Sequence, residues 1–390
     1  MIKKLFSLLI CFIVFFSTDI TAKANQIGVS AQSAVLMCVN SGEVLFSKNE
    51  NKKLSMASTT KIMTSLIALE EATPEREIIV TSEMVSVEGT SMGLKIGDSV
   101  SLRELVYGMM LQSGNDAANT VAHVVGGSPE NFAKIMNERA KQIGMNNTNF
   151  VTASGLDDKM HYSTAFDMAL LAAESIKNPE FRFICSQKSA KLTYGNPPYP
   201  RTLTNHNRLL WKYSGSIGIK TGFTKKSGRC LVSAAERNGI TLVAVTLNAG
   251  DDWNDHISMF EFGFSKCESV PIECDLPSIN LKVFGGDKSY LPLKLSRQPV
   301  GVKGKMYSYR FVVKQFEYAP IDNGKIAGTA IFSLNGKIVD EIPLVTDGES
   351  QVKKYNPENN EVKEKENKFS EFLNKIKSYF NLRLCYGVHR

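Results

Sequence analysis

The strongest constraint on the fold is a lysine that lies directly among apolar residues in segment 54–69, LSMASTTKIMTSLIAL. Ser58, Thr59 and Thr60 precede it, and such residues favour helix N-termini because their oxygens accept hydrogen bonds from unpaired backbone N–H groups. We therefore expect a buried helix that begins at Ser58. Residues three apart share a helix face, so this helix would hold the Lys61 amine beside the Ser58 hydroxyl.

This pair of side chains predicts nucleophilic chemistry. A lysine in apolar surroundings loses proton affinity, so Lys61 could accept the proton of Ser58 and make that oxygen a nucleophile. The alternative is an ordinary N-cap serine followed by a lysine that extends its amine to solvent. Because the Ser-x-x-Lys pattern is common, taken alone it favours the alternative.

A second motif interrupts a helical pattern in segment 101–127, SLRELVYGMMLQSGNDAANTVAHVVGG. The interruption, Ser113-Gly114-Asn115, would present a hydroxyl and an amide on a loop held rigidly between two buried helices. The hydroxyl of Ser113 can relay a proton to a leaving amine, and the amide of Asn115 can bind a substrate backbone. The alternative is a helix-breaking turn, in which glycine and asparagine are common.

A third motif lies in segment 215–250, GSIGIKTGFTKKSGRCLVSAAERNGITLVAVTLNAG, which alternates as sheet and has ERNG as a hairpin turn. Lys220, Thr221 and Gly222 end the strand before that hairpin. The glycine would let a peptide substrate approach the strand backbone closely. The lysine and the threonine can bind a carboxylate and support the electrostatics of the serine–lysine pair. Alone, the tripeptide predicts only a strand end.

Composition excludes several other kinds of site. With 43% hydrophobic and 22% charged residues the chain is globular, and its net charge of +7 favours an anionic surface without any nucleic-acid motif. The 7 cysteines form no C-x-x-C pair and no metal-like cluster with the 5 dispersed histidines, although Cys267 and Cys274 could bridge. Neither a zinc site nor a Cys/His nucleophile is indicated. A serine nucleophile with a lysine base is therefore the leading candidate for the chemistry of this chain.

The three motifs in this order are typical of penicillin-recognising serine enzymes. The chain resembles the low-molecular-weight penicillin-binding proteins, specifically the exported D-alanyl-D-alanine carboxypeptidases. The resemblance covers about residues 34–264 and includes ASTTKIMTSL, GTSMGLKIGD, MMLQSGNDAANTVA, HYSTAFDMALLA and GIKTGFT. It implies an α/β (α+β) catalytic domain of the β-lactamase/transpeptidase type, in which helices flank an antiparallel sheet.

The resemblance also implies a mechanism. Ser58 would attack the carbonyl between two D-alanines of a peptidoglycan stem peptide, Lys61 would remove its proton, and Ser113 would pass that proton to the departing amine. β-Lactam antibiotics would acylate the same serine. No metal or organic cofactor is implied. Substrate binding falls to Asn115, Lys220, Thr221 and Gly222, and the oxyanion hole to the backbone N–H groups of Ser58 and Phe223.

One family feature has no clear counterpart here. Family members often supply an arginine near the substrate carboxylate, either before Lys-Thr-Gly or at a later strand end. The corresponding segments read TNHNRLLW and LNAGDDWND, and Arg208 is the only arginine in them. We expect a surface packing role for Arg208, so the carboxylate site depends on Lys220 and Thr221.

Three other functions stay open at this point. A class A β-lactamase would add a glutamate in a Glu-x-x-Leu-Asn context, which is missing between Asn115 and Lys220, and its loop would read Ser-Asp-Asn. A non-catalytic wall-binding protein would not need the intact motifs. An endopeptidase that cuts D-alanyl cross-links shares the same chemistry, and only its products distinguish it.

The N-terminal segment predicts export. Residues 1–24, MIKKLFSLLICFIVFFSTDITAKA, combine Lys3 and Lys4, an apolar run, and Ala22 and Ala24 in an A-x-A arrangement. This is the layout of a secretory signal peptide cleaved after Ala24, and the run is short for a transmembrane helix. An uncleaved anchor is the alternative. We expect a peripheral protein on the periplasmic, extracytoplasmic face of the cell membrane.

The remaining chain divides by composition. We expect the catalytic domain over 25–266, a small all-β sandwich domain over 267–350, a polar linker over 351–367 and an amphipathic helix over 368–390. Apolar residues in that last segment recur at helical spacing and basic residues flank them, which is typical of a helix in a membrane interface. A helix docked on the β domain is the alternative. The apolar residues are Phe369, Phe372, Leu373, Ile376, Phe380 and Leu384, and the basic ones are Lys368, Lys375, Lys377 and Arg383.

Overall fold

The computed structural model describes residues 27–274, 279–353 and 369–375. The predicted signal peptide lies outside these ranges, and so does most of the predicted linker and C-terminal helix. The described chain forms two compact units, while the predicted domain limits stay predictions. The larger unit takes in the chain up to Glu273 with Gln298–Tyr309 and Phe332–Glu341, and the smaller takes in Cys274–Arg297, Arg310–Ile331 and the chain from Ile342 onward.

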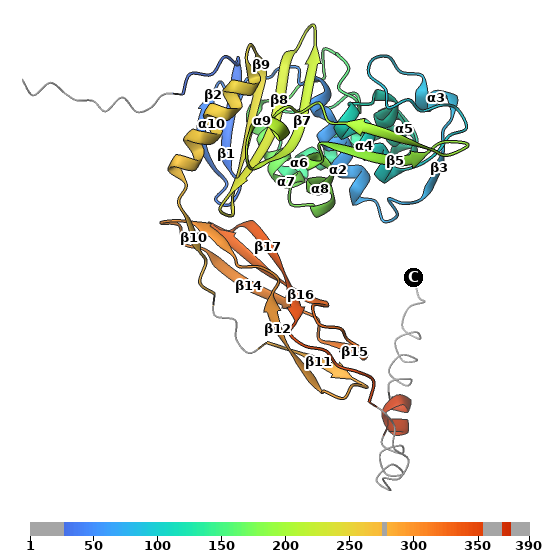
Figure 1. Ribbon diagram of the computed structural model, residues 1–390, viewed down its shortest axis with the longest axis vertical. Coiled ribbons are helices and arrows are strands. Elements are labelled where there is room, and N and C mark those ends of the chain that lie inside the picture. Colours follow the sequence, from blue (N-terminus) through green and yellow to red (C-terminus); the bar gives the residue numbers. More distant parts are fainter. Residues whose placement is uncertain (1–26, 275–278, 354–368, 376–390) are drawn as a thin grey trace, which may run out of the picture. The chain divides into compact units, whose positions relative to one another are not determined.

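A five-stranded antiparallel sheet forms the centre of the larger unit (Figure 1). Its middle strands are buried along nearly their whole length, which explains why they read as continuous apolar runs. The hairpin with the ERNG turn pairs as the sequence predicts. The strand order is β2 (Glu43–Lys48), β1 (Ser33–Cys38), β9 (Ile240–Ala249), β8 (Gly228–Arg237) and β7 (Ser216–Thr224).

Helices cover both faces of this sheet, because successive strand residues point to opposite faces. Val35 and Met37 of β1 pack into one apolar cluster, whereas Leu36 and Cys38 pack into another. The first cluster contains residues of α2 (Lys61–Glu70), α4 (Leu102–Gln112), α5 (Asn115–Gly126), α6 (Pro129–Ile143), α7 (Ala165–Ser175) and α8 (Pro179–Ser186). The second contains residues of α9 (Leu209–Lys212) and α10 (Asp252–Lys266).

Short elements complete the larger unit. They are the 3₁₀ turn η1 (Ala57–Thr60), the helix α3 (Ser82–Val85), the paired strands β3 (Glu77–Ile79) and β4 (Ser99–Ser101), and the hairpin of β5 (Ser189–Tyr194) and β6 (Tyr199–Thr204). Cys267 and Cys274, whose side chains could have bridged, are not joined by a disulfide.

The chain after α10 is rich in strands, as the resemblance implies. A six-stranded sheet has the order β14 (Ser308–Val313), β16 (Ile326–Leu334), β17 (Lys337–Thr346), β12 (Tyr290–Leu295), β11 (Asn280–Phe284) and β15 (Phe316–Tyr318). A separate pair joins β10 (Ser269–Pro271) and β13 (Val300–Val302). The predicted fold class, a helix-flanked antiparallel sheet followed by a β-rich region, is confirmed.

Part of the predicted C-terminal helix is described. Residues 369–375 are helical, and their side chains, including Phe369, Phe372 and Leu373, are exposed. The apolar positions from Ile376 onward lie outside the described residues. Within the described ranges, no helix combines the length and the apolar character that a membrane span requires.

Candidate active site

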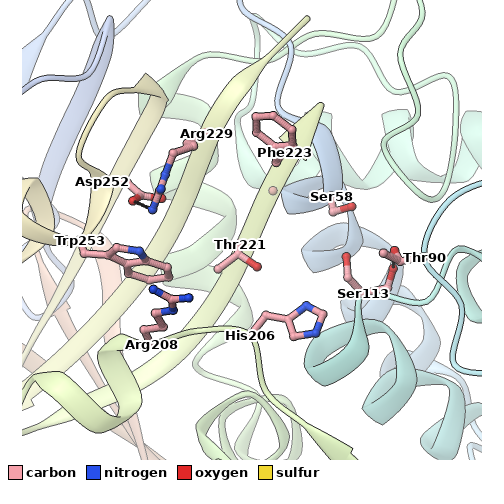
Figure 2. A pocket seen from close by; sticks show the side chains of 11 residues that line it. Ser58, Thr90, Ser113, His206, Arg208, Thr221, Phe223, Arg229, Asp252 and Trp253 are labelled. Atoms are coloured by element: carbon pink, nitrogen blue, oxygen red, sulfur yellow. Dashed lines mark hydrogen bonds and ion pairs between the residues drawn. The ribbon is translucent and has the colours of Figure 1, made fainter. Parts of the chain in front are cut away.

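The three sequence motifs meet at one pocket of about 530 Å³ (Figure 2). Each motif comes from a different element: Ser58 from η1, Ser113 from the junction of α4 and α5, and Thr221 from β7. The lining also includes Thr90, His206, Arg208, Gly222, Phe223, Arg229, Asp252 and Trp253. The fold therefore brings together hydroxyl, imidazole and cationic groups that the chain keeps far apart in sequence.

The Ser58 turn differs from the predicted helix start. Ser58 lies in the 3₁₀ turn η1, the α-helix begins at Lys61, and Ala57 just before the serine has a φ of +47°. The hydroxyl of Ser58 caps no backbone N–H. It lies instead 2.9 Å from the Lys61 amine, so the predicted pairing is confirmed although the predicted cap is wrong.

Three oxygens surround the amine of Lys61, which is fully buried. Nζ lies 2.9 Å from Ser58 Oγ, 2.7 Å from Asn115 Oδ1 and 2.7 Å from the carbonyl oxygen of Ser154. Asn115 also donates from Nδ2 to the carbonyl of Glu88 at 2.7 Å, which fixes the amide with its oxygen toward the lysine. The position of the amine is therefore set by three separate segments.

Burial decides the charge of this amine. Desolvation lowers the pKa of Lys61 well below 10.5, the positive charge of Lys220 lowers it further, and Asp116 partly opposes both. Desolvation also lowers the pKa of Lys220 to about 7. A neutral Lys61 can donate two hydrogens, to Asn115 and Ser154, and direct its lone pair at the hydroxyl of Ser58. This is the arrangement that a general base requires.

Ser113 and its loop are held by a neighbouring segment. Ser113 ends α4 in a left-handed conformation with a φ of +60°, and its carbonyl accepts a hydrogen bond from Thr90 Oγ1 at 2.6 Å. Its hydroxyl lines the pocket and forms no hydrogen bond with any other described residue. The buried carboxylate of Asp116 ties the same segment down by accepting from Ser91 Oγ and from the N–H groups of Met92, Gly93 and Leu94.

Strand β7 passes directly beside the Ser58 turn. A Cβ at Gly222 would lie only 3.0 Å from the Met56 carbonyl and 3.1 Å from Ser58 N, so the glycine permits this approach. Next to it, Thr221 and Phe223 line the pocket, whereas the buried Lys220 donates from Nζ to the Thr221 carbonyl at 2.9 Å.

A loop that sequence reasoning gave no role crosses the other side of the turn. Its Ser154 carbonyl accepts from Lys61, and a Cβ at Gly155 would lie 1.9 Å from the Ala57 carbonyl. His161 accepts from Val151 N at Nδ1, which leaves the hydrogen on Nε2, 2.8 Å from Thr60 Oγ1. The segment SGLDDKMHYSTA carries Ser154, Gly155 and His161, but only contacts distant in sequence give them a role.

The far wall of the pocket holds two arginines. Arg208, for which a surface packing role was expected, lines the pocket instead. Arg229, to which no sequence motif points, forms an ion pair with Asp252, and its guanidinium carbon lies 5.8 Å from the centroid of the Trp253 ring system. Since Asp252 and Trp253 begin α10, the helix on the opposite face of the sheet closes this end of the pocket.

Comparison with known proteins identifies the family. A family model described as D-alanyl-D-alanine carboxypeptidase, peptidase family S11, matches residues 19–251. The chain belongs to this family. D-alanyl-D-alanine carboxypeptidase DacC of Escherichia coli is 36% identical over 85% of this chain and 86% of its own length. DacF of Bacillus subtilis is 32% identical over 88% and 93%.

A solved structure shares the family fold. The D-alanyl-D-alanine carboxypeptidase DacD from Francisella tularensis is 27% identical, with a TM-score of 0.60. The alignment covers 87% of this chain and 98% of that one. The family resemblance predicted from the three motifs is therefore confirmed.

Replacing Gly155 tests whether the crossing loop positions the lysine. Gly155→Ala should lower the free energy of unfolding by about 1–3 kcal/mol more than Gly127→Ala, because the new methyl group meets the Ala57 carbonyl. Gly127 is a matched control, since its φ is also positive, at +72°, but no atom lies within 4 Å of an added Cβ. Gly155→Ala should also be acylated more slowly than Gly127→Ala. Denaturant unfolding measures the change in stability, and the rate of labelling by a fluorescent penicillin measures the change in acylation. Equal stability and equal acylation in the two variants would contradict the account.

Proposed function

We propose that this chain removes the terminal D-alanine from peptidoglycan stem peptides through an acyl-enzyme on Ser58. The observation that supports this most is the Lys61 amine, buried, depressed in pKa, and 2.9 Å from Ser58 Oγ. Activation of a hydroxyl needs a nearby neutral base, and this amine meets that requirement. The family relatives are named for the same activity.

Acylation follows from this arrangement. Ser58 Oγ attacks the carbonyl carbon of the penultimate D-alanine while Lys61 takes the hydroxyl proton. The bond to the nitrogen of the last D-alanine then breaks, and Ser113 gives its hydroxyl proton to that nitrogen while it takes up the proton that Lys61 had removed. Water afterwards hydrolyses the ester, which frees Ser58 and the shortened peptide.

The remaining predicted residues hold the substrate. Asn115 and Gly222 would contact the peptide backbone, and Lys220 and Thr221 would bind the terminal carboxylate, where a cation and a hydroxyl pair well with the anion. The N–H groups of Ser58 and Phe223 would stabilise the oxyanion, and each such donor typically contributes about 3–4 kcal/mol to lowering the barrier. The close approach at Gly222, which brings β7 against the serine turn, supports this pairing of donors.

The nucleophile can be identified from a covalent adduct. Benzylpenicillin should form one long-lived adduct, located on Ser58 by mass spectrometry of peptides, and Ser58→Ala should abolish both the adduct and release of D-alanine. The adduct should persist because the chain lacks the Glu-x-x-Leu-Asn glutamate of class A β-lactamases. An adduct on another residue, or turnover as fast as in those lactamases, would contradict the proposal.

The proton carriers should differ in their effects. Lys61→Ala should lose nearly all acylation, because within the described residues no other amine touches Ser58. Ser113→Ala should slow turnover by about 10²–10⁴-fold, as expected for one lost proton-transfer group. Stopped-flow acylation rates decide this. A Lys61→Ala variant that acylates at the rate of the unchanged chain would exclude the lysine as base.

Product analysis tests the reaction itself. With purified muropeptides, the chain should convert monomeric pentapeptides to tetrapeptides with release of free D-alanine, detected by chromatography and mass spectrometry. Cleavage of cross-linked dimers without loss of terminal D-alanine would indicate an endopeptidase instead. Binding of muropeptides without cleavage would indicate a wall-binding protein.

We also propose that the chain is exported and held at the extracytoplasmic membrane surface by its C-terminal segment. The signal-peptide pattern at 1–24 and the basic apolar stripe from Lys368 onward support this. The exposed Phe369, Phe372 and Leu373 of the described helical turn supply apolar surface for such a contact.

Deleting residues from Lys368 onward should release the mature protein from membranes and leave its activity on soluble peptides unchanged. Each basic residue near anionic lipid contributes about 1 kcal/mol to binding, and high salt screens this contribution. Salt should therefore weaken binding of the full chain, but only partly, because the apolar contribution persists. Flotation with liposomes measures this. A truncated chain that still floats as well as the full one would place the anchor elsewhere, for example in an uncleaved N-terminal segment.

A further inference from the structure

Four exposed aromatic side chains share one face at the edge of the β-rich sheet. Strand β11 pairs with β15 in the register Lys282↔Phe316 and Phe284↔Tyr318, and with β12 in the register Lys282↔Tyr290. Paired residues point to the same side of a sheet. We call Phe284, Tyr290, Phe316, Tyr318 and Lys282 the aromatic face; β12, β11 and β15 lie side by side in Figure 1.

The rings of this face cluster while remaining open to solvent. The Phe284 centroid lies 5.3 Å from that of Phe316 and 6.0 Å from that of Tyr318. Exposed fractions are 41% for Phe284, 45% for Phe316, 58% for Tyr290 and 65% for Tyr318. Because a monomer gains no stability from large apolar side chains gathered at its surface, such a cluster indicates a binding site for another molecule or a membrane.

The opposite side of the same strands already forms the core of this unit. Leu281, Val283, Leu291 and Leu293 alternate with the aromatic face and are buried. The aromatic face is therefore not the packing surface of the sheet. It is a second apolar surface that the folding of this unit leaves uncovered.

The charges beside the rings select the kind of partner. Lys282 Nζ lies 4.8 Å from the Phe284 ring centroid, and Lys282 forms no ion pair with any described residue. The outward positions of β11, β12 and β15 carry no carboxylate; Glu317, on the other side of β15, pairs with Lys314 and Lys325. The one ion pair printed for an outward residue of β12 joins Lys294 to Asp347. Aromatic rings beside the cation of Lys282 match the headgroup region of an anionic bilayer.

The path of the chain gives an independent reason for this partner. Val352 bridges Gly286, and Lys353 N donates to the Gly285 carbonyl at 2.9 Å, so the chain leaves the unit beside the turn that follows Phe284. The next described residues, 369–375, form the helical turn with exposed Phe369 and Phe372. The last residue described before the proposed anchor, Lys353, thus lies at the edge that carries the aromatic face.

We propose that the aromatic face is a second membrane contact, which places its rings among the lipid headgroups with Lys282 beside their phosphates. This inference rests on the proposed anchoring by the C-terminal segment. Alone, four half-exposed rings bind a bilayer weakly. Once the C-terminal helix is bound, the same contact becomes intramolecular and strengthens the attachment.

Vesicle binding by the full mature chain tests this contact. Titration with vesicles of phosphatidylethanolamine and phosphatidylglycerol should show affinity about 5–20-fold lower for the double variant Phe316→Ser, Tyr318→Ser. The control is the double variant Val312→Ser, Ile326→Ser. It removes two exposed apolar side chains from β14 and β16, which lie toward the opposite edge of the sheet, and should change affinity less than 2-fold. Activity on soluble peptides should stay unchanged in both.

Depth measurement separates direct contact from an indirect effect. Phe316→Trp should gain fluorescence quenching by brominated lipid, whereas Val312→Trp should not, against the common background of Trp211 and Trp253. Equal quenching in both, or equal affinity in the serine variants, would overturn the inference.

A loss of binding to wall sacculi with vesicle binding unchanged would instead assign the face to glycan, and a changed sedimentation coefficient in the absence of vesicles would assign it to a second copy. If the full chain binds no vesicles at all, the anchoring proposal itself fails.

Discussion

The site depends on one buried amine whose three contacts come from distant parts of the chain. Lys61 reaches Ser58 within its own turn and helix, Asn115 from the α4–α5 junction and Ser154 from the crossing loop. Burying an ammonium without a carboxylate in contact is costly, so the surroundings favour the neutral amine. The same burial that would count against stability provides the base that the chemistry needs.

The rest of the fold fixes these three contacts. Strand β7 holds the serine turn from one side through the close approach at Gly222, and the crossing loop holds it from the other through Gly155. Asp116 binds the segment that carries Thr90, and Thr90 in turn holds the Ser113 carbonyl. A rigid arrangement of this kind keeps the hydroxyl and the amine aligned before substrate arrives, which is one source of the rate enhancement of such sites.

Local patterns predicted much of this architecture, and long-range contacts account for the rest. The apolar runs of β8 and β9 and the Ser113-Gly114-Asn115 break predicted elements that the structure contains, because burial and turn chemistry act over a few residues. The 3₁₀ turn at Ser58, the carbonyl of Ser154 and the Arg229–Asp252 pair were not predictable. A backbone carbonyl carries no sequence signal, and an ion pair between β8 and α10 arises only from the way the helix packs on the sheet.

The pH dependence of acylation tests the central claim that Lys61 is neutral when the enzyme acts. The second-order rate of acylation by a β-lactam should rise with pH as Lys61 loses its proton and level off well below pH 10.5, where an ordinary lysine titrates. Because the charge of Lys220 lowers the pKa of Lys61, Lys220→Gln should move this rise to higher pH, even though the maximal rate also falls. A rate that keeps rising to pH 10.5 in the unchanged chain, or a rise that Lys220→Gln leaves in place, would contradict the account.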